Sequence, residues 1–331
     1  MRAGLFPRIP LITAAVKRWL KRIGLAVLLL LAGGIALAWT PEGDRTALEA
    51  EYGGAASRFL ALAPGLRVHV RDQGPRGAPA LLLVHGSNAS LHTWEPWIAR
   101  LGDRYRVVTL DLPGHGLTGA HPSGDYSEAM FVATIGAVAD RLRLDRFVIG
   151  GNSMGGELAW KYALEQPQRV RGLLLVDASG APGAYPTKVP IGFRIIQSPV
   201  LKPIVRHLTP RSIIEQSLKD SLAVQDVVTP AMVDRYWELL TYPGNRDATL
   251  DRSGFPRRDA TVAEMRRLRM PTLIQWGADD RLIPLRWGEW YARHIPDARL
   301  IAYPRTGHIP MEERPDATAR DVAAWLATLP A

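Results

Sequence analysis

A serine on a tight turn is the first group in this chain with an evident chemical use. Ser153 lies in the pentapeptide GNSMG at 151–155, directly after the apolar run 147–149. Glycine on both sides permits a sharp turn from a strand into a helix, which leaves the serine hydroxyl exposed at the end of the strand. The sequence therefore predicts a nucleophilic serine at this turn.

An aspartate and a histidine follow two later strands. The apolar stretches 272–276 and 298–303 are typical of strands; Asp280 follows the first and His308 follows the second. Because parallel strands end at one edge of a sheet, Ser153, Asp280 and His308 can meet there. An imidazole can take the proton of a serine hydroxyl, and a carboxylate on its other nitrogen fixes the tautomer that does so.

Two backbone amides complete this chemistry. The apolar strand 80–84 is followed by His85-Gly86-Ser87. A bend at the glycine can aim the N–H of Ser87 at the same point as the N–H of Met154, where an oxyanion would develop. Each such donor is worth roughly 2.7–4 kcal/mol in the transition state.

Together these segments resemble the α/β-hydrolase fold serine hydrolases over residues 66–328. The resemblance is carried by His85-Gly86, DLPGHG at 111–116, the turn at 151–155, Gly277 with Asp280 and Pro284, and Gly307-His308 with Glu313 and Pro315. It implies an α/β fold with a mostly parallel eight-stranded sheet flanked by helices and a helical cap insertion. It also implies Ser153 as nucleophile, Asp280 as acid and His308 as base. The oxyanion hole would consist of the backbone N–H groups of Ser87 and Met154. The resemblance further implies that His85 shapes the bend beside it and transfers no proton.

The acid has two further candidates. Asp279 adjoins Asp280, and Asp177 follows the apolar strand 172–176, a position that some members of the family use instead. The family spacing from Gly277 to Pro284 favours Asp280. Otherwise Asp279 is a solvated or turn-capping carboxylate, and Asp177 a turn residue that accepts hydrogen bonds from backbone N–H groups.

Composition and patterning predict five segments along the chain. They are a basic N-terminus with an apolar segment (1–41), a linker (42–58), the first part of the hydrolase core (59–179), a helical cap (180–262) and the second part of the core (263–331). Within the cap, the patterns at 211–222 and 230–240 predict helices, the second with an apolar face.

The N-terminal segment has the features of a membrane anchor. Six basic residues and no acidic ones precede 23–41, which carries no charge and would span roughly 28 Å as a helix. Positive residues before such a segment favour a cytoplasmic N-terminus and a catalytic domain outside the cytoplasm, on the periplasmic side. The alternative is a secreted protein after signal cleavage near Ala38, because Ala36-Leu37-Ala38 fits a small-x-small cleavage pattern.

Charge and residue types narrow the partners. The net charge is +9, but the N-terminal residues account for most of it, so we predict no nucleic-acid partner. Cysteine is absent, as are a His-Glu-x-x-His motif and a Gly-Lys-Ser/Thr sequence after the glycine-rich turn. We therefore predict no disulfide, no metal and no cofactor. The remaining histidines, with Trp94 and Trp97, are expected to be packing or surface residues.

The predicted activity is hydrolysis of a hydrophobic small-molecule carboxylic ester through an acyl-enzyme on Ser153, as in carboxylesterases and lipases. An alternative is a carbon–carbon hydrolase of the meta-cleavage-product type, because the GNSMGG turn at 151–156 resembles theirs. An alternative of another class is a non-catalytic, membrane-tethered binder of small molecules. Reaction with a fluorophosphonate would separate an activated serine from such a binder.

Overall fold

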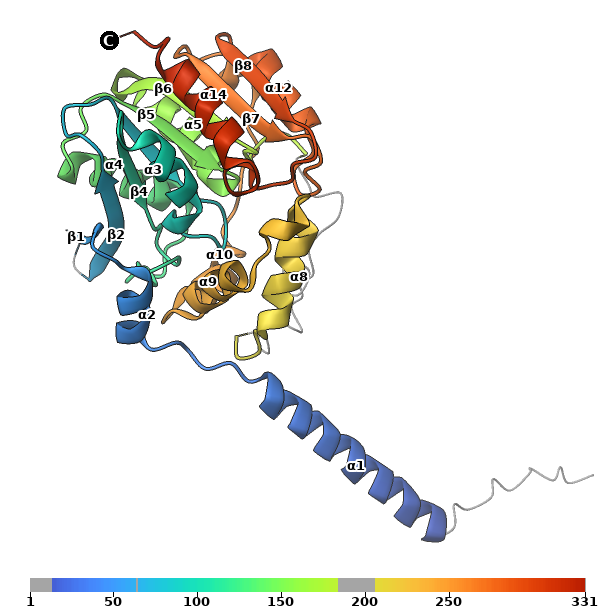
Figure 1. Ribbon diagram of the computed structural model, residues 1–331. Coiled ribbons are helices and arrows are strands. Elements are labelled where there is room, and N and C mark those ends of the chain that lie inside the picture. Colours follow the sequence, from blue (N-terminus) through green and yellow to red (C-terminus); the bar gives the residue numbers. More distant parts are fainter. Residues whose placement is uncertain (1–13, 64, 184–205, 331) are drawn as a thin grey trace, which may run out of the picture.

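An eight-stranded sheet forms the centre of the protein in this computed structural model, which describes residues 14–63, 65–183 and 206–330 (Figure 1). The strand order is β1-β2-β4-β3-β5-β6-β7-β8. β2 pairs antiparallel with β1 and β4, and the other neighbours are parallel. The strands are Ser57–Ala63 (β1), Leu66–Gln73 (β2), Ala80–Val84 (β3), Arg106–Leu110 (β4), Phe147–Asn152 (β5), Val170–Val176 (β6), Thr272–Gly277 (β7) and Ala298–Tyr303 (β8). This arrangement confirms the predicted fold class.

Helices cover both faces of the sheet. Leu81 and Leu83 of β3 pack in one apolar cluster with α3 and α14, whereas Leu82 and Val84 pack in another with α4, α5 and α12. Because successive side chains of a strand point to opposite faces, a strand covered on both sides must be apolar throughout. The helices are Glu95–Leu101 (α3), Glu128–Arg141 (α4), Met154–Glu165 (α5), Arg286–His294 (α12) and Pro315–Leu326 (α14). Trp94 and Trp97 are fully buried, as expected of packing residues.

In the part of the chain that the structure describes, three helices of eight or more residues lie between β6 and β7, and we call them the cap helices. They are Arg211–Ser221 (α8), Pro230–Thr241 (α9) and Asn245–Arg252 (α10). The first two match the helices predicted at 211–222 and 230–240, and Met232 and Val233 bury the apolar face of α9. Part of the predicted cap, 184–205, lies outside the described residues. Short elements complete the chain: Leu91–Trp94 (η1), Pro167–Arg169 (η2), Gln225–Val227 (η3), Val262–Met265 (α11) and Pro310–Glu313 (α13).

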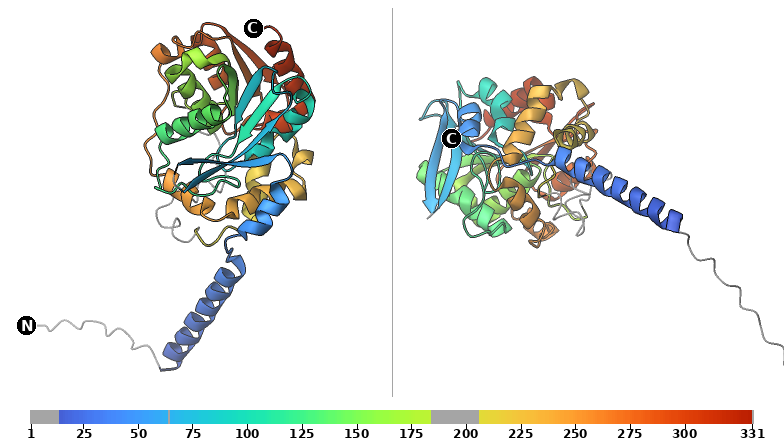
Figure 2. Two further views of the ribbon diagram at one scale, coloured as in Figure 1. Left: turned by 90° about the vertical axis from the view of Figure 1, so that its left-hand side faces the viewer. Right: turned by 90° about the horizontal axis from the view of Figure 1, so that it is seen from below.

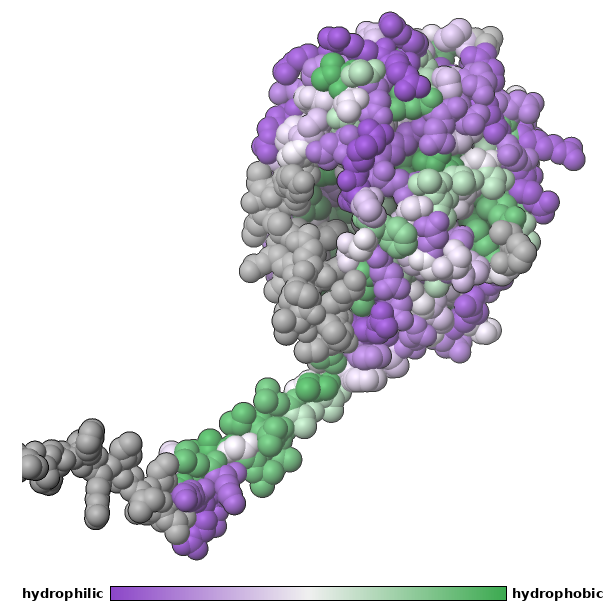
Figure 3. Space-filling model, turned by 180° about the vertical axis from the view of Figure 1, so that it is seen from behind, coloured by the Kyte–Doolittle hydropathy of each residue, from purple (hydrophilic) through white to green (hydrophobic). Residues whose placement is uncertain are grey.

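The N-terminal helix α1, Ala14–Ala38, projects away from the body of the protein in every view (Figures 1 and 2). Its window Val16–Ala36 has a mean hydropathy of 1.7 and none of it is buried. Figure 3 shows the resulting apolar surface along the helix. Helix α1 is therefore long and apolar enough to cross a membrane, although a signal sequence has the same length and composition.

Residues 39–54, which we call the strap, connect α1 to the sheet. Here the structure differs from the predicted linker, because the strap contains helix α2, Arg45–Tyr52, capped by the side chain of Asp44. Leu48 is buried against Leu239 and Tyr242 of the cap region. The N–H of Gly43 also donates to the carbonyl of Thr241 (2.8 Å). The strap therefore packs on the cap helices.

Candidate active site

Ser153 stands on a strained turn between β5 and α5. Its φ of 54° lies in the left-handed region, which a residue other than glycine adopts at a cost of about 1–3 kcal/mol. The flanking glycines are required by close packing: a Cβ at Gly155 would lie 2.1 Å from the carbonyl oxygen of Val84, and one at Gly151 would lie 2.3 Å from the backbone of Gly155. The turn thus holds the serine hydroxyl at the carboxyl edge of the sheet.

The loop after β3 packs directly against this turn. A Cβ at Gly86 would lie 3.1 Å from the Cβ of Ser153, and the Ser87 hydroxyl contacts the Met154 sulfur at 3.5 Å. The structure therefore brings together the two segments whose amides are predicted to form the oxyanion hole.

His85 has a structural role in this loop, as expected. Its Nδ1–H donates to the carbonyl of Gly86 (2.7 Å), and its Nε2 accepts from the N–H of Leu112 (3.0 Å). Burial lowers the pKa of His85 and so favours the neutral imidazole that this arrangement requires. The side chain fixes the bend without offering a nitrogen to a substrate.

His308 and Asp280 are hydrogen-bonded to each other. The Nδ1 of His308 lies 2.7 Å from Oδ2 of Asp280, and both side chains are buried. The other oxygen of Asp280 accepts the N–H groups of Leu282 (2.7 Å) and Ile283 (3.0 Å), which stabilise a negative carboxylate. This carboxylate fixes the tautomer of His308, leaving Nε2 as the basic nitrogen.

The two alternative acids are placed differently. Asp279 is exposed and contributes no contact to His308 among the described residues. Asp177 is buried at the end of β6 and accepts the N–H of Gly277 (2.9 Å). One side-chain atom from each of Asp177, Asp280 and His308 lies within 4.8 Å of the other two. These are ligand types that a metal could use, but Nδ1 of His308 and both oxygens of Asp280 are already engaged in hydrogen bonds.

Asn152 links the serine turn to residues 304–309, the loop that carries His308, which we call the histidine loop. Its amide donates to the carbonyl of His308 (3.0 Å) and to that of Val176 (3.2 Å). In the part of the chain that the structure describes, no hydrogen bond joins the Ser153 hydroxyl to His308. Catalytic hydrogen bonds are often long before substrate binds, so this geometry is compatible with a serine–histidine pair. No motif in the sequence indicates this role of Asn152.

The cap also holds the histidine loop. The N–H of His308 donates to the carbonyl of Ser221 at the end of α8 (3.0 Å). One oxygen of Glu313 accepts the N–H of Gly307 (2.9 Å), and the other accepts the N–H groups of Ala223 and Val224 (2.9 Å each). The position of His308 therefore depends on the end of α8.

Arg252, at the end of cap helix α10, lies beside the serine turn. Its guanidinium donates to Nε2 of His115 (2.8 Å) and contacts the Met154 sulfur (3.3 Å). No described carboxylate lies within 4.0 Å of it, and burial lowers its pKa to about 10, with Arg257 adding repulsion. Burial together with Arg252 also lowers the pKa of His115. No sequence pattern predicts a functional role for Arg252 or His115.

A second Ser-His-Asp array, with a buried histidine and aspartate and a half-buried serine, lies at the edge of the sheet. His69 lies 2.7 Å from Asp111 and 2.6 Å from the hydroxyl of Ser57. The Ser57 hydroxyl donates to the carbonyl of Gly53, so its proton does not point toward the imidazole. His69 therefore cannot take the hydroxyl proton of Ser57, as activation of a nucleophile would require. The array is a structural network and not a reactive one.

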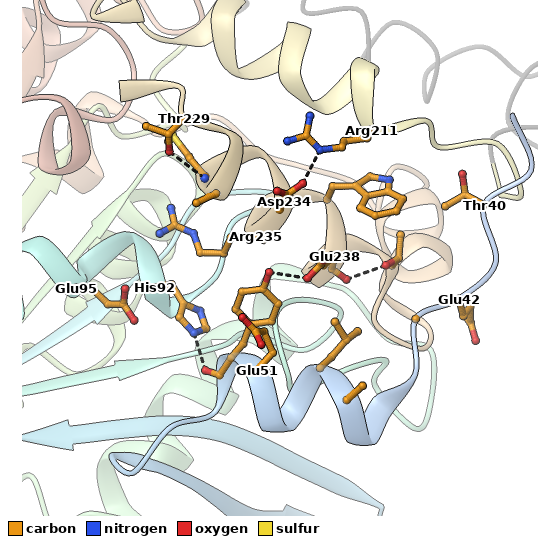
Figure 4. Close-up of a pocket in the computed structure, with 18 of the residues that line it drawn as sticks. Thr40, Glu42, Glu51, His92, Glu95, Arg211, Thr229, Asp234, Arg235 and Glu238 are labelled. Atoms are coloured by element: carbon orange, nitrogen blue, oxygen red, sulfur yellow. Dashed lines mark hydrogen bonds and ion pairs between the residues drawn. The ribbon is translucent and has the colours of Figure 1, made fainter. Parts of the chain in front are cut away.

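A cleft of about 1290 Å³ opens between the strap, α3 and α9 (Figure 4). The hydroxyl of Tyr52 donates to Glu238 across it (2.6 Å), and Arg235 pairs with Glu312. Burial, followed by the hydrogen bond to Glu238, raises the pKa of Tyr52. Trp39, the first residue after α1, also lines the cleft, so the cleft lies at the junction between the apolar helix and the catalytic body.

Comparisons with known proteins place this geometry in context. A family model described as alpha/beta hydrolase fold matches residues 79–315. The 2-hydroxy-6-oxononadienedioate/2-hydroxy-6-oxononatrienedioate hydrolase of Comamonas testosteroni is 27% identical over 269 residues, covering 79% of this chain and 91% of that protein. The 2-hydroxy-6-oxo-2,4-heptadienoate hydrolase of Pseudomonas putida is 30% identical over 258 residues, covering 75% and 88%.

A solved structure extends the similarity toward the N-terminus. It is a membrane phospholipase A described as a bacterial virulence factor, with a TM-score of 0.70 and 26% identity, and the match covers 94% of this chain and 98% of that one. The uncovered 6% contains fewer residues than the N-terminal segment 1–41. The match therefore includes part of that segment.

Proposed function

Because the chain belongs to the α/β-hydrolase fold family, we propose that it is a serine hydrolase that cleaves a carboxylic ester through an acyl-enzyme intermediate. The observation that carries the proposal is the hydrogen bond between His308 and Asp280 (2.7 Å), next to the strained turn that presents Ser153. An oriented imidazole beside an exposed serine is the arrangement that serine acylation needs.

Each residue has a defined role in this mechanism. Ser153 attacks the ester carbonyl while Nε2 of His308 takes its proton and then returns it to the leaving alcohol. Asp280 holds Nδ1–H and stabilises the imidazolium. The backbone N–H groups of Ser87 and Met154 stabilise the oxyanion. Water activated by His308 then hydrolyses the acyl-enzyme.

The substrate that we propose is a hydrophobic ester drawn from a membrane. Support comes from the exposed apolar helix α1 and from the similarity to a membrane phospholipase A that includes part of the N-terminal segment. We further propose that α1 is an uncleaved anchor and that the catalytic domain lies on the periplasmic side. The uncompensated guanidinium of Arg252 beside Met154 favours an ester that carries an anionic group.

The second candidate is cleavage of a carbon–carbon bond. The Comamonas testosteroni and Pseudomonas putida relatives are named as hydrolases of 2-hydroxy-6-oxo acids, and they match three quarters of this chain or more. Such substrates also carry carboxylates that Arg252 could bind. The same serine, histidine and aspartate would serve either reaction.

The test compares both substrate classes on the full-length protein in detergent micelles. Hydrolysis of p-nitrophenyl esters of increasing acyl length and of lysophospholipids is measured beside a 2-hydroxy-6-oxo-dienoate. Ser153→Ala and His308→Ala should abolish ester turnover and labelling by a fluorophosphonate. Turnover of the dienoate alone would support the carbon–carbon hydrolase instead. Failure of the folded wild-type protein to react with the probe would point to a non-catalytic binder.

A further inference from the structure

Asp177 is a buried carboxyl group for which the mechanism above has no use. It follows β6 with a φ of 43°, in the left-handed region, and its side chain is inaccessible to solvent. Its Oδ1 accepts the N–H of Gly277, but its Oδ2 receives no hydrogen bond from any described residue. A buried oxygen without a donor is costly for an ionised carboxylate and far less so for a carboxylic acid.

The neighbours of Asp177 carry negative charge. Asp280 lies beside it: one carboxylate oxygen of Asp177, one of Asp280 and one ring nitrogen of His308 all lie within 4.8 Å of one another. Asp280 accepts three hydrogen bonds, from His308, Leu282 and Ile283, and so holds the charge. Two adjacent buried carboxyl groups do not both ionise readily, and the one with fewer donors takes the proton.

The other titratable groups near Asp177 act in the same direction. Burial, followed by the charge of Asp280, raises the pKa of Asp177 well above its usual range, and Glu313 adds to the effect. Tyr303 of β8 also faces this cluster, and burial raises its pKa, so it remains neutral. Apart from the imidazole of His308, no described basic side chain contacts Asp177.

We propose that Asp177 is a protonated carboxylic acid that donates a hydrogen bond to Asp280, and that it can replace Asp280 as the partner of His308. The proposal rests on the roles assigned above to Ser153, Asp280 and His308. In the intact protein Asp177 keeps its proton through turnover and acts as a positioning residue. By sharing the negative charge of Asp280, it moderates the basicity of His308.

Loss of the charge on Asp280 would change this state. In Asp280→Asn, the nearby anion that favours the protonated form of Asp177 is gone. Asp177 can then release its proton to solvent and accept the Nδ1–H of His308 as a carboxylate. The acid would thus move from the end of β7 to the end of β6, while serine and histidine keep their places.

The first experiment is a double-mutant cycle on the full-length protein, using kcat/KM for a p-nitrophenyl ester. Asp280→Asn should lose about 10- to 100-fold, whereas Asp177→Asn/Asp280→Asn should lose about 10⁴-fold, the loss expected when histidine has no carboxylate. Asp177→Asn alone should stay within about threefold of wild type. Its amide can accept from Gly277 and donate to Asp280. Asp279→Asn, an exposed neighbour, is the matched control.

A pH profile separates this role from simple packing. Asp177→Leu removes the donor to Asp280, so the imidazolium of His308 gains stability and the acid limb of kcat/KM should move to higher pH. Asp177→Asn retains the donor and should leave that limb in place. Should Asp177→Leu fail to fold, the cycle with asparagine still decides the question.

Two results would overturn the proposal. One is an Asp177→Asn/Asp280→Asn double variant that is no slower than Asp280→Asn, which would show that the residual activity of Asp280→Asn does not depend on Asp177. The other is a loss of about 10⁴-fold for Asp177→Asn alone, which would make Asp177 the primary acid. Ester turnover that survives Ser153→Ala would instead refute the proposed function, and is therefore distinguishable from both.

Discussion

Replacing Arg252 with methionine should make the protein more stable and less active on anionic substrates. The folded-state pKa of about 10 lies below the ordinary 12.5, so the protonated side chain destabilises the fold at every pH below 10. The shift corresponds to at most about 3 kcal/mol, and partial exposure reduces this to about 1–2 kcal/mol. Methionine retains an apolar stem of similar length without the charge, and should raise the melting temperature by about 2–6 °C.

The activity should change in the opposite direction, and only for anionic esters. A charge-assisted hydrogen bond contributes about 1.5–3 kcal/mol, which corresponds to roughly a 10- to 150-fold loss of kcat/KM. The assay compares the p-nitrophenyl monoester of glutaric acid with neutral p-nitrophenyl pentanoate, and lysophosphatidate with monoacylglycerol. The two pairs distinguish a carboxylate from a phosphate as the preferred anion.

The control for this experiment is Arg258→Met. Arg258 is exposed and pairs with Glu264, so its loss should leave both stability and selectivity nearly unchanged. Equal losses on neutral and anionic esters for Arg252→Met, or a lower melting temperature, would show that Arg252 serves packing and not substrate recognition.

Three other perturbations test the remaining contacts of the site. Asn152→Ala should lower kcat by up to about 10²-fold with little change in KM, because it releases the carbonyl of His308 and lets the loop shift; an unchanged kcat in steady-state assays would refute this role. Glu313→Gln should destabilise the fold by about 1–3 kcal/mol in urea unfolding, because its amide would face the N–H groups of Ala223 and Val224. The control Glu289→Gln, at an exposed position, should leave the free energy of unfolding unchanged. Burial alone would raise the pKa of Glu157, but the positive charges of Arg257 and Lys161 lower it to about 2. Its stabilising contribution is therefore complete above pH 4.5 and is lost as the pH falls toward 2, so Glu157→Gln should flatten the acid limb of a stability–pH curve.

The parts of the site that could be predicted are those set by strand ends. Ser153, Asp280 and His308 each follow an apolar strand, and a parallel sheet brings such positions to one edge whatever the intervening sequence. The contact between Asn152 and His308 could not be predicted, because it joins groups 156 residues apart through the orientation of one amide. The same holds for Arg252, whose position depends on how the cap packs.

The strap shows a similar limit. Its small and acidic residues predict a linker, and the signal for helix α2 is only the capping residue Asp44 and a single buried leucine. The partners that stabilise it, Glu238 and Tyr242, lie about 190 residues away in sequence. Local composition carries no information on such partners, so the sequence of the strap predicts a linker and not a packed helix.

The bonds between the end of α8 and the histidine loop bear on how this enzyme could diversify. A cap that shares no bonds with the catalytic residues behaves as a module, which recombination or protein engineering can exchange. Here Ser221 and Glu313 connect the two regions, so a chimera with a foreign cap would lose hydrogen bonds that hold the loop of His308. Grafts that retain 221–224 together with Glu313 should keep these hydrogen bonds, whereas exchange of α9 or α10 would also break the contacts of Arg235 with Glu312 and of Arg252 with His115.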